Sequence, residues 1–179
     1  NVWFVGTANH DETTVAFADK THDRAHVQVL PANYVPFQAT NQGKVDPVSF
    51  ESLDSAFTTA SKHYAGDAEK VKEFLRSSIH GEFAEFGVGW GNRLERQIDR
   101  FVPVVLDSGG DITEAVDHLI ATKLVRKLED RFGIRPEQLE RLADNIEVHW
   151  DQLQELASPD KTLAALRGEA KKLRGGFGS

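Results

Sequence analysis

The chain of 179 residues contains no cysteine and no methionine. Without cysteine it cannot form a disulfide framework, a thiolate nucleophile or a cysteine-ligated zinc site. No run approaches the roughly 18 apolar residues that a membrane-spanning helix needs, and nothing in the sequence indicates secretion, so we expect a cytoplasmic protein with no membrane contact. Because the first residue is not methionine and the chain starts beside the apolar run Val2–Val5, we expect a piece of a longer protein.

The charge balance is acidic, with 28 Asp and Glu against 21 Lys and Arg and a net charge of −7. This balance argues against a dominant nucleic-acid footprint. The hydrophobic share of 40% and the charged share of 27% are those of an ordinary globular domain. Two basic segments, Lys123–Arg135 and Lys161–Arg174, stand out locally. We interpret them as solvated helix faces, with a binding role as the less favoured alternative.

The first thirty residues differ from the rest of the chain. Val2–Val5 and His26–Leu30 are rich in β-forming residues and predict two strands, with a short helix at Phe17–Ala25 between them. Two strands do not make a stable parallel sheet, so further strands are expected upstream. Pro31–Asp46 has the composition of a linker.

Beyond the linker the sequence predicts helices almost throughout. Asp46 followed by Pro47 is a typical helix start, and Asp67 is expected to cap a second helix that stops near Gly81. Phe86–Gly91 has too much glycine for a helix and predicts a loop. In the helix that follows, Pro103 is expected either to kink the helix or to end it.

The final third predicts a longer helix and a hairpin. Asp111–Glu114 forms a capping-box pattern whose helix is expected to end at Gly133. Apolar residues in Leu139–Leu156 and Leu163–Leu173 alternate steps of three and four, as in a packed helical hairpin. His149 on this seam is interpreted as a core or partner-facing histidine and not as a ligand.

The predicted fold class is therefore mainly α, with a small α/β remnant of two strands followed by a helical bundle and a C-terminal helical hairpin. The expected domains are residues 1–35, 36–133 and 134–179.

Two residues near the predicted strands are candidates for contacts with a ligand. Asn9 follows the first strand, at the edge where α/β proteins bind ligands, and it could orient a water or a phosphate oxygen. Arg24 lies on the turn after the short helix and could place a planar cation against a phosphate. Taken singly, a turn cap at Asn9 and a surface ion pair at Arg24 are the favoured explanations. His22 and His26 stand four apart but no third ligand is spaced with them, so we expect no metal site.

Taken together, these motifs resemble a known family. Gly6–Thr14, Phe17–Lys20 and Asp23–Val27 are similar to the second half of the AAA+ module of McrB-type NTPases, the motor subunits of modification-dependent restriction systems. The resemblance implies that Asn9 is the sensor that helps to position the attacking water. It implies that Arg24 is an arginine finger that reaches the nucleotide of a neighbouring subunit.

The resemblance continues downstream. Phe86–Gly91 resembles the family's aromatic-glycine loop, and Arg93 then resembles the second sensor at the start of a lid helix, with Arg96 as the alternative one turn later. Ala115–Leu128 resembles a further lid helix, although Arg126-Lys127 replaces the proline-containing end of the family pattern. The resemblance implies ATP or GTP with Mg²⁺ in the intact parent and a ring homo-oligomer, a hexamer by family likeness. A nuclease partner subunit and indirect action on DNA are also implied.

The phosphate-binding loop of such an NTPase is missing. Its pattern needs Gly-x-x-x-x-Gly-Lys-Ser/Thr, and the nearest match, Gly43-Lys44-Val45, has Gln38 in place of the first glycine and no hydroxyl after the lysine. No apolar strand ends in paired acidic residues that could hold a metal ion. We therefore expect that this chain alone binds no nucleotide stably and does not hydrolyse it.

An alternative from another class remains open. The chain could be a non-enzymatic helical interaction module whose hairpin, Leu139–Leu173, docks a partner. In either case the apolar run Val2–Val5 would be an exposed edge, and we expect it to cause self-association.

Overall fold

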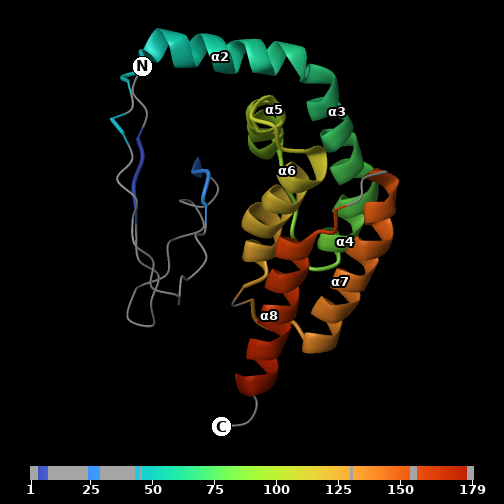
Figure 1. The fold of residues 1–179 in the computed structure, drawn as a ribbon. Helices are drawn as coiled ribbons and strands as arrows, with labels where there is room; N and C mark the ends of the chain where they lie inside the picture. Colours follow the sequence, from blue (N-terminus) through green and yellow to red (C-terminus); the bar gives the residue numbers. More distant parts are fainter. Residues whose placement is uncertain are drawn as a thin grey trace.

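The computed structural model describes residues 4–7, 24–28, 43–44, 46–129, 131–153 and 157–176. The prediction of a mainly α protein is confirmed (Figure 1). The two-strand remnant is not seen: residues 4–5 and 26–28, the described parts of the predicted strands, form no strand. A strand needs a neighbouring strand for its backbone hydrogen bonds, and the described residues offer none. The rest of Val2–Val5 and His26–Leu30 lies outside the described residues.

The helical elements follow one another with short connections. They are α2 (Phe50–His63), α3 (Ala65–Phe74), the π-helical η1 (Leu75–Ile79), α4 (His80–Ala84), α5 (Asn92–Asp107), α6 (Ile112–Leu119), the π-helical η2 (Ile120–Leu124), the 3₁₀ turn η3 (Val125–Lys127), α7 (Pro136–Trp150), the 3₁₀ turn η4 (Asp151–Leu153) and α8 (Asp160–Gly176). Figure 1 shows α2 across one end of the bundle and α7 beside α8. No helix in the described ranges has the length and hydrophobicity to cross a membrane.

One apolar core runs from α3 to α8. It includes side chains of α5 such as Ile98, of η2 such as Leu124, and of the hairpin such as Ile146 and Leu166. Helices α3 to α6 and the hairpin of α7 and α8 thus contribute to the same core; the division at residues 36–133 and 134–179 stays a prediction. The hairpin seam faces this core and is covered by the chain itself.

Several predicted helix ends are wrong. α2 starts after Ser49 and not at Asp46, because the Ser49 hydroxyl accepts a hydrogen bond from the Ser52 N–H at 3.1 Å and so serves as the N-cap. Gly81 does not end a helix, since the chain continues through η1 into α4, where Phe83 is fully buried. Pro103 does not end α5, which continues to Asp107 with Pro103 buried; the other alternative, a kink at Pro103, stays a prediction.

Other local predictions are confirmed. The chain leaves the helix between Ala84 and Asn92, as the glycines of Phe86–Gly91 required. The break at Gly109-Gly110 is present, and Gly109 has a φ of +86°, which glycine adopts without strain. Asp111 caps α6, with its carboxylate accepting the N–H of Glu114 at 2.7 Å. However, the helix that it opens becomes π-helical at Ile120 and ends at Lys127, before Gly133.

The C-terminal helix is capped by a side chain from another helix. The carboxylate of Asp117 on α6 accepts the backbone N–H groups of Lys161 at 2.9 Å and Thr162 at 2.8 Å, both in the first turn of α8. The Thr162 hydroxyl donates in return to the Asp117 carbonyl oxygen at 3.2 Å. Because the first N–H groups of a helix have no partner within it, this carboxylate anchors α8 on α6.

We therefore predict that Asp117→Ala lowers the free energy of unfolding by about 3–6 kcal/mol, since its carboxylate accepts two hydrogen bonds and each hydrogen bond to a charged group contributes roughly 1.5–3 kcal/mol. Urea unfolding followed by circular dichroism measures the change. Asp144→Ala, which removes an exposed aspartate from α7, is the matched control and should change stability by less than about 0.5 kcal/mol. Equal effects of the two substitutions would contradict the capping role.

Candidate functional site

The loop between α4 and α5 is held by basic side chains from the segment after η2. Arg131 donates through Nη1 to the carbonyl oxygen of Phe86, and Lys127 donates through Nζ to the carbonyl oxygen of Gly89 at 3.2 Å. Within the loop, the N–H of Val88 donates to the carbonyl oxygen of Phe83 at 3.1 Å, and Val88 is buried. The loop is therefore fixed at the point where it enters α5.

A small cleft of about 60 Å³ opens beside this loop. It is lined by Trp90, Gly91, Arg93, Leu94, Gln97, Lys123 and Lys127. We call it the basic cleft, because three of these described lining residues are cations and none is a carboxylate. In a chain with a net charge of −7, such a grouping is a local exception.

Arg93 reaches the basic cleft because it lies in the first turn of α5. Gly91 precedes the helix in an extended conformation and offers no capping side chain. The N-terminus of a helix carries partial positive charge, so a cation there is not favoured by the helix dipole.

The other predicted site residues are placed differently. Arg96 is exposed, as Arg93 is, but it is not among the residues that line the basic cleft. Arg24 is also exposed, and the carbonyl oxygen of the next residue, Ala25, accepts a hydrogen bond from Nζ of Lys123. Asn9 lies outside the described residues. The structure therefore brings Arg93 to the cleft and places the backbone next to Arg24 against a residue of the same cleft.

A second cleft of about 250 Å³ lies where residues 26–28 meet α5, α6 and α8. Three rings stack along it: the ring centroids of His26 and Phe101 are 5.1 Å apart, and those of Phe101 and His118 are also 5.1 Å apart. The lining also includes Glu114 and Lys161. This stack holds segment 24–28 against the bundle, together with the Lys123–Ala25 hydrogen bond.

The two histidines of the stack have lowered pKa values. Partial removal from water lowers the pKa of the His26 ring, and the charges of Lys123 and His118 add to this, although the residue as a whole stays exposed. Burial also lowers the pKa of His118, assisted by Lys161 and Lys123 and opposed by Asp117 and Glu114. Both rings are therefore held in the neutral form at neutral pH.

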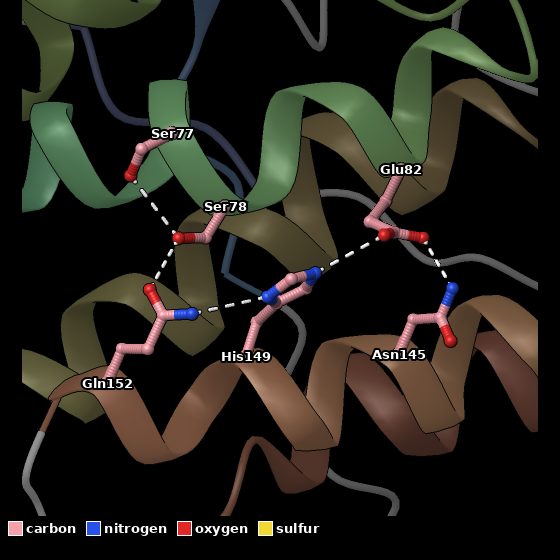
Figure 2. Close-up of polar contacts among 6 residues, drawn as sticks. All are labelled: Ser77, Ser78, Glu82, Asn145, His149 and Gln152. Atoms are coloured by element: carbon pink, nitrogen blue, oxygen red, sulfur yellow. Dashed lines mark hydrogen bonds and ion pairs between the residues drawn. The ribbon is translucent and has the colours of Figure 1, made fainter.

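A polar network joins α7 to the η1–α4 segment (Figure 2). The Ser78 hydroxyl donates to Gln152 Oε1 at 2.7 Å, and Gln152 Nε2 lies 3.4 Å from His149 Nδ1. His149 Nε2 lies 3.2 Å from Glu82 Oε1, whose other oxygen accepts from Asn145 at 2.7 Å.

Serine, histidine and glutamate side chains occur together in the catalytic sites of hydrolases. The geometry of this network does not support hydrolysis with Ser78 as the nucleophile. Gln152 separates the serine from the histidine, and Ser78 is only 7% exposed. A catalytic base must reach the proton of its nucleophile directly or through one water. We interpret the network as a structural connection in which His149 is half-buried. The prediction that it is a core or partner-facing histidine and not a ligand stays a prediction.

Sequence reasoning missed Lys123, Lys127 and the His26–Phe101–His118 stack. The available signal was the basic segment Lys123–Arg135, which we interpreted as a solvated helix face. In the structure Lys123 is buried and Lys127 is half-buried. The spacing of the charges along the chain did not reveal that this face is covered by the α4–α5 loop and by segment 24–28.

Among the described residues, no group of three or more His, Asp or Glu side chains is arranged to hold a metal ion. Comparison of the chain with protein-family models, with curated proteins and with solved structures gave no match.

The histidine stack predicts a pH-dependent stability. Because the pKa values of His26 and His118 are lowered by folding, the unfolded chain takes up protons first as the pH falls through about 6.5, the ordinary pKa of histidine. The free energy of unfolding should therefore decrease as the pH is lowered from about 7.5 to 5.5, above the range where carboxylates titrate. Urea unfolding at a series of pH values measures this decrease.

The matched variant is His118→Gln, which should lose stability less steeply over the same interval. A decrease as steep as that of the unchanged chain would contradict the assignment to His118.

Proposed function

We propose that this chain is the sensor, finger and lid portion of an AAA+ NTPase of the McrB type, a cytoplasmic motor whose nucleotide hydrolysis is coupled to DNA restriction or remodelling. The motifs Gly6–Thr14 and Asp23–Val27 support it from the sequence. The observation that carries the proposal is the basic cleft, in which Arg93 at the start of α5 shares a surface with Lys123 and Lys127.

Polyphosphate is the ligand class that suits this lining. Guanidinium and ammonium groups donate charge-assisted hydrogen bonds to phosphate oxygens, and the first N–H groups of α5 add partial positive charge. No described lining residue is a carboxylate.

Mg²⁺ does not suit the basic cleft. It is bound through carboxylates, waters and phosphate oxygens, whereas the described lining side chains offer it only the amide of Gln97. In the proposed parent, the metal ion of ATP or GTP is therefore held by an upstream segment that also supplies the phosphate-binding loop. This chain alone is expected to be inactive.

The proposed roles divide between two subunits of a ring. Arg93 contacts the phosphates bound to its own subunit, in preference to its alternative Arg96, which lies one turn later and outside the lining of the basic cleft. Asn9 positions the attacking water. Arg24, which is exposed, reaches the nucleotide of the next subunit, so the active form is a ring homo-oligomer, proposed to be a hexamer. A nuclease partner subunit would convert the motor's work into action on DNA.

The interaction-module alternative is weakened by the packing. Leu139, Ile146 and Leu166 on the hairpin seam are fully buried in the chain's own core. A partner would therefore have to dock on another face of the hairpin, where these apolar seam residues cannot contribute to its binding.

The basic cleft can be tested with tripolyphosphate as the probe, by calorimetry at low ionic strength. Arg93→Ala should weaken binding about tenfold, because a hydrogen bond between charged groups is worth roughly 1.5–3 kcal/mol and about 1.4 kcal/mol is a factor of ten. Arg96→Ala, on the same helix but outside the cleft lining, is the control and should leave the affinity nearly unchanged. Binding that is absent, or lost equally in both variants, would argue against the proposal.

The finger is tested in a parent that includes the upstream strands. Arg24→Ala should lower hydrolysis about 10³-fold or more, the usual contribution of an arginine finger, while Arg100→Ala, an exposed arginine on α5, should not. Mixing Arg24→Ala subunits with subunits that cannot bind nucleotide should restore activity, because each defect lies in a different subunit. Full activity of Arg24→Ala alone would show that the residue is not a finger.

A further inference from the structure

Lys123 lies between the basic cleft and the segment that carries Arg24. It belongs to the π-helical η2, and only 6% of the residue is exposed. Its Nζ donates to the carbonyl oxygen of Ala25, the residue after Arg24. The same side chain lines the basic cleft with Arg93 and Lys127. The Lys123 side chain therefore contacts the backbone beside Arg24 and also lines the basic cleft.

Segment 24–28 is fastened to the bundle by two described contacts of different kinds. Lys123 holds the backbone at Ala25, and the His26 ring stacks on Phe101. Arg24 makes up the exposed end of this segment. A change at the Lys123 contact therefore shifts the backbone next to Arg24, while the ring stack keeps the segment near the bundle.

The Lys123 ammonium has a reason to exchange one partner for another. A buried ammonium is costly unless its N–H groups are bonded, and a neutral carbonyl oxygen is a weaker acceptor for it than an anionic phosphate oxygen. Charge-assisted hydrogen bonds are roughly twice as strong as those between neutral groups. An anion in the basic cleft therefore competes with the Ala25 carbonyl for Lys123.

We infer that Lys123 is a positioning residue that couples occupancy of the basic cleft to the placement of Arg24. When a phosphate group enters the cleft, Lys123 turns from the Ala25 carbonyl to the phosphate, and the backbone beside Arg24 is released. The inference rests on the proposed function, since it takes polyphosphate as the ligand of the cleft. In a ring, it lets a subunit that has bound nucleotide free its own Arg24 for the neighbouring subunit.

Nuclear magnetic resonance of the full chain during titration with tripolyphosphate tests the inference. The indole N–H of Trp90, which lines the basic cleft, reports binding. The amide of Ala25 and the imidazole of His26 report the state of segment 24–28. We expect the Ala25 and His26 signals to change together with the Trp90 signal, with one common binding curve.

Three variants separate the roles of the lysines. In Lys123→Met, the Ala25 and His26 signals should start at their released positions and no longer respond to the anion. In Lys127→Met, which changes another lining residue of the basic cleft, more tripolyphosphate should be needed but the final shift should be unchanged. Lys161→Met, which removes a lysine from the second cleft, is the control and should keep the full response.

The outcomes distinguish the two proposals. If Trp90 responds while Ala25 and His26 do not, the coupling is overturned and the phosphate-binding cleft remains. If Trp90 does not respond at saturating probe concentration, the proposed function of the cleft fails and the coupling fails with it. Because the titration of the unsubstituted chain decides between these results, a Lys123→Met protein that does not fold leaves the test intact.

Discussion

The arrangement of this protein depends on the packing of α5 against α6 within the common apolar core. Ile98, Val102, Val116 and Ile120 are fully buried in this core, and burying each such side chain stabilises the fold by roughly 1.5–3 kcal/mol. The same contact brings Arg93 near Lys123 and Lys127. The three cations line the same cleft.

The two π-helical segments both bring polar side chains to buried positions. Ser78 in η1 begins the hydrogen-bonded chain that leads through Gln152 to His149 (Figure 2), and Lys123 in η2 joins the basic cleft to Ala25. A π-helical turn has a wider hydrogen-bond spacing than an α-helix and is frequent at functional sites. It shifts the register of every residue that follows it. The apolar period of the sequence therefore does not indicate which polar residues are turned inward.

Features set by neighbouring residues could be predicted, and features set by distant partners could not. The glycines of Phe86–Gly91 and the Asp111 cap act within a few residues, so the loop and the start of α6 were foreseen. Gly81 and Pro103 disfavour helix locally, yet burial of neighbouring apolar side chains such as Phe83 and Val102 keeps both inside helices. For the candidate site, the sequence offered Arg93 and Arg96 as alternatives. Only the packing of the loop against Lys127 places Arg93 alone at the cleft.

The sequence by itself determined that this chain is helical, that it lacks a phosphate-binding loop and cysteine chemistry, and that its last part is a hairpin with one apolar seam. These properties follow from composition and from spacing within single helices. The tertiary structure decided that the seam is covered by the chain's own core, that Asp117 caps α8, and that Lys123 lies between Arg93 and the backbone beside Arg24. Each of these contacts joins residues far apart in the sequence. Such pairs form because the whole apolar surface is buried at once, and a pattern of neighbouring residues does not report which distant segments that burial brings together.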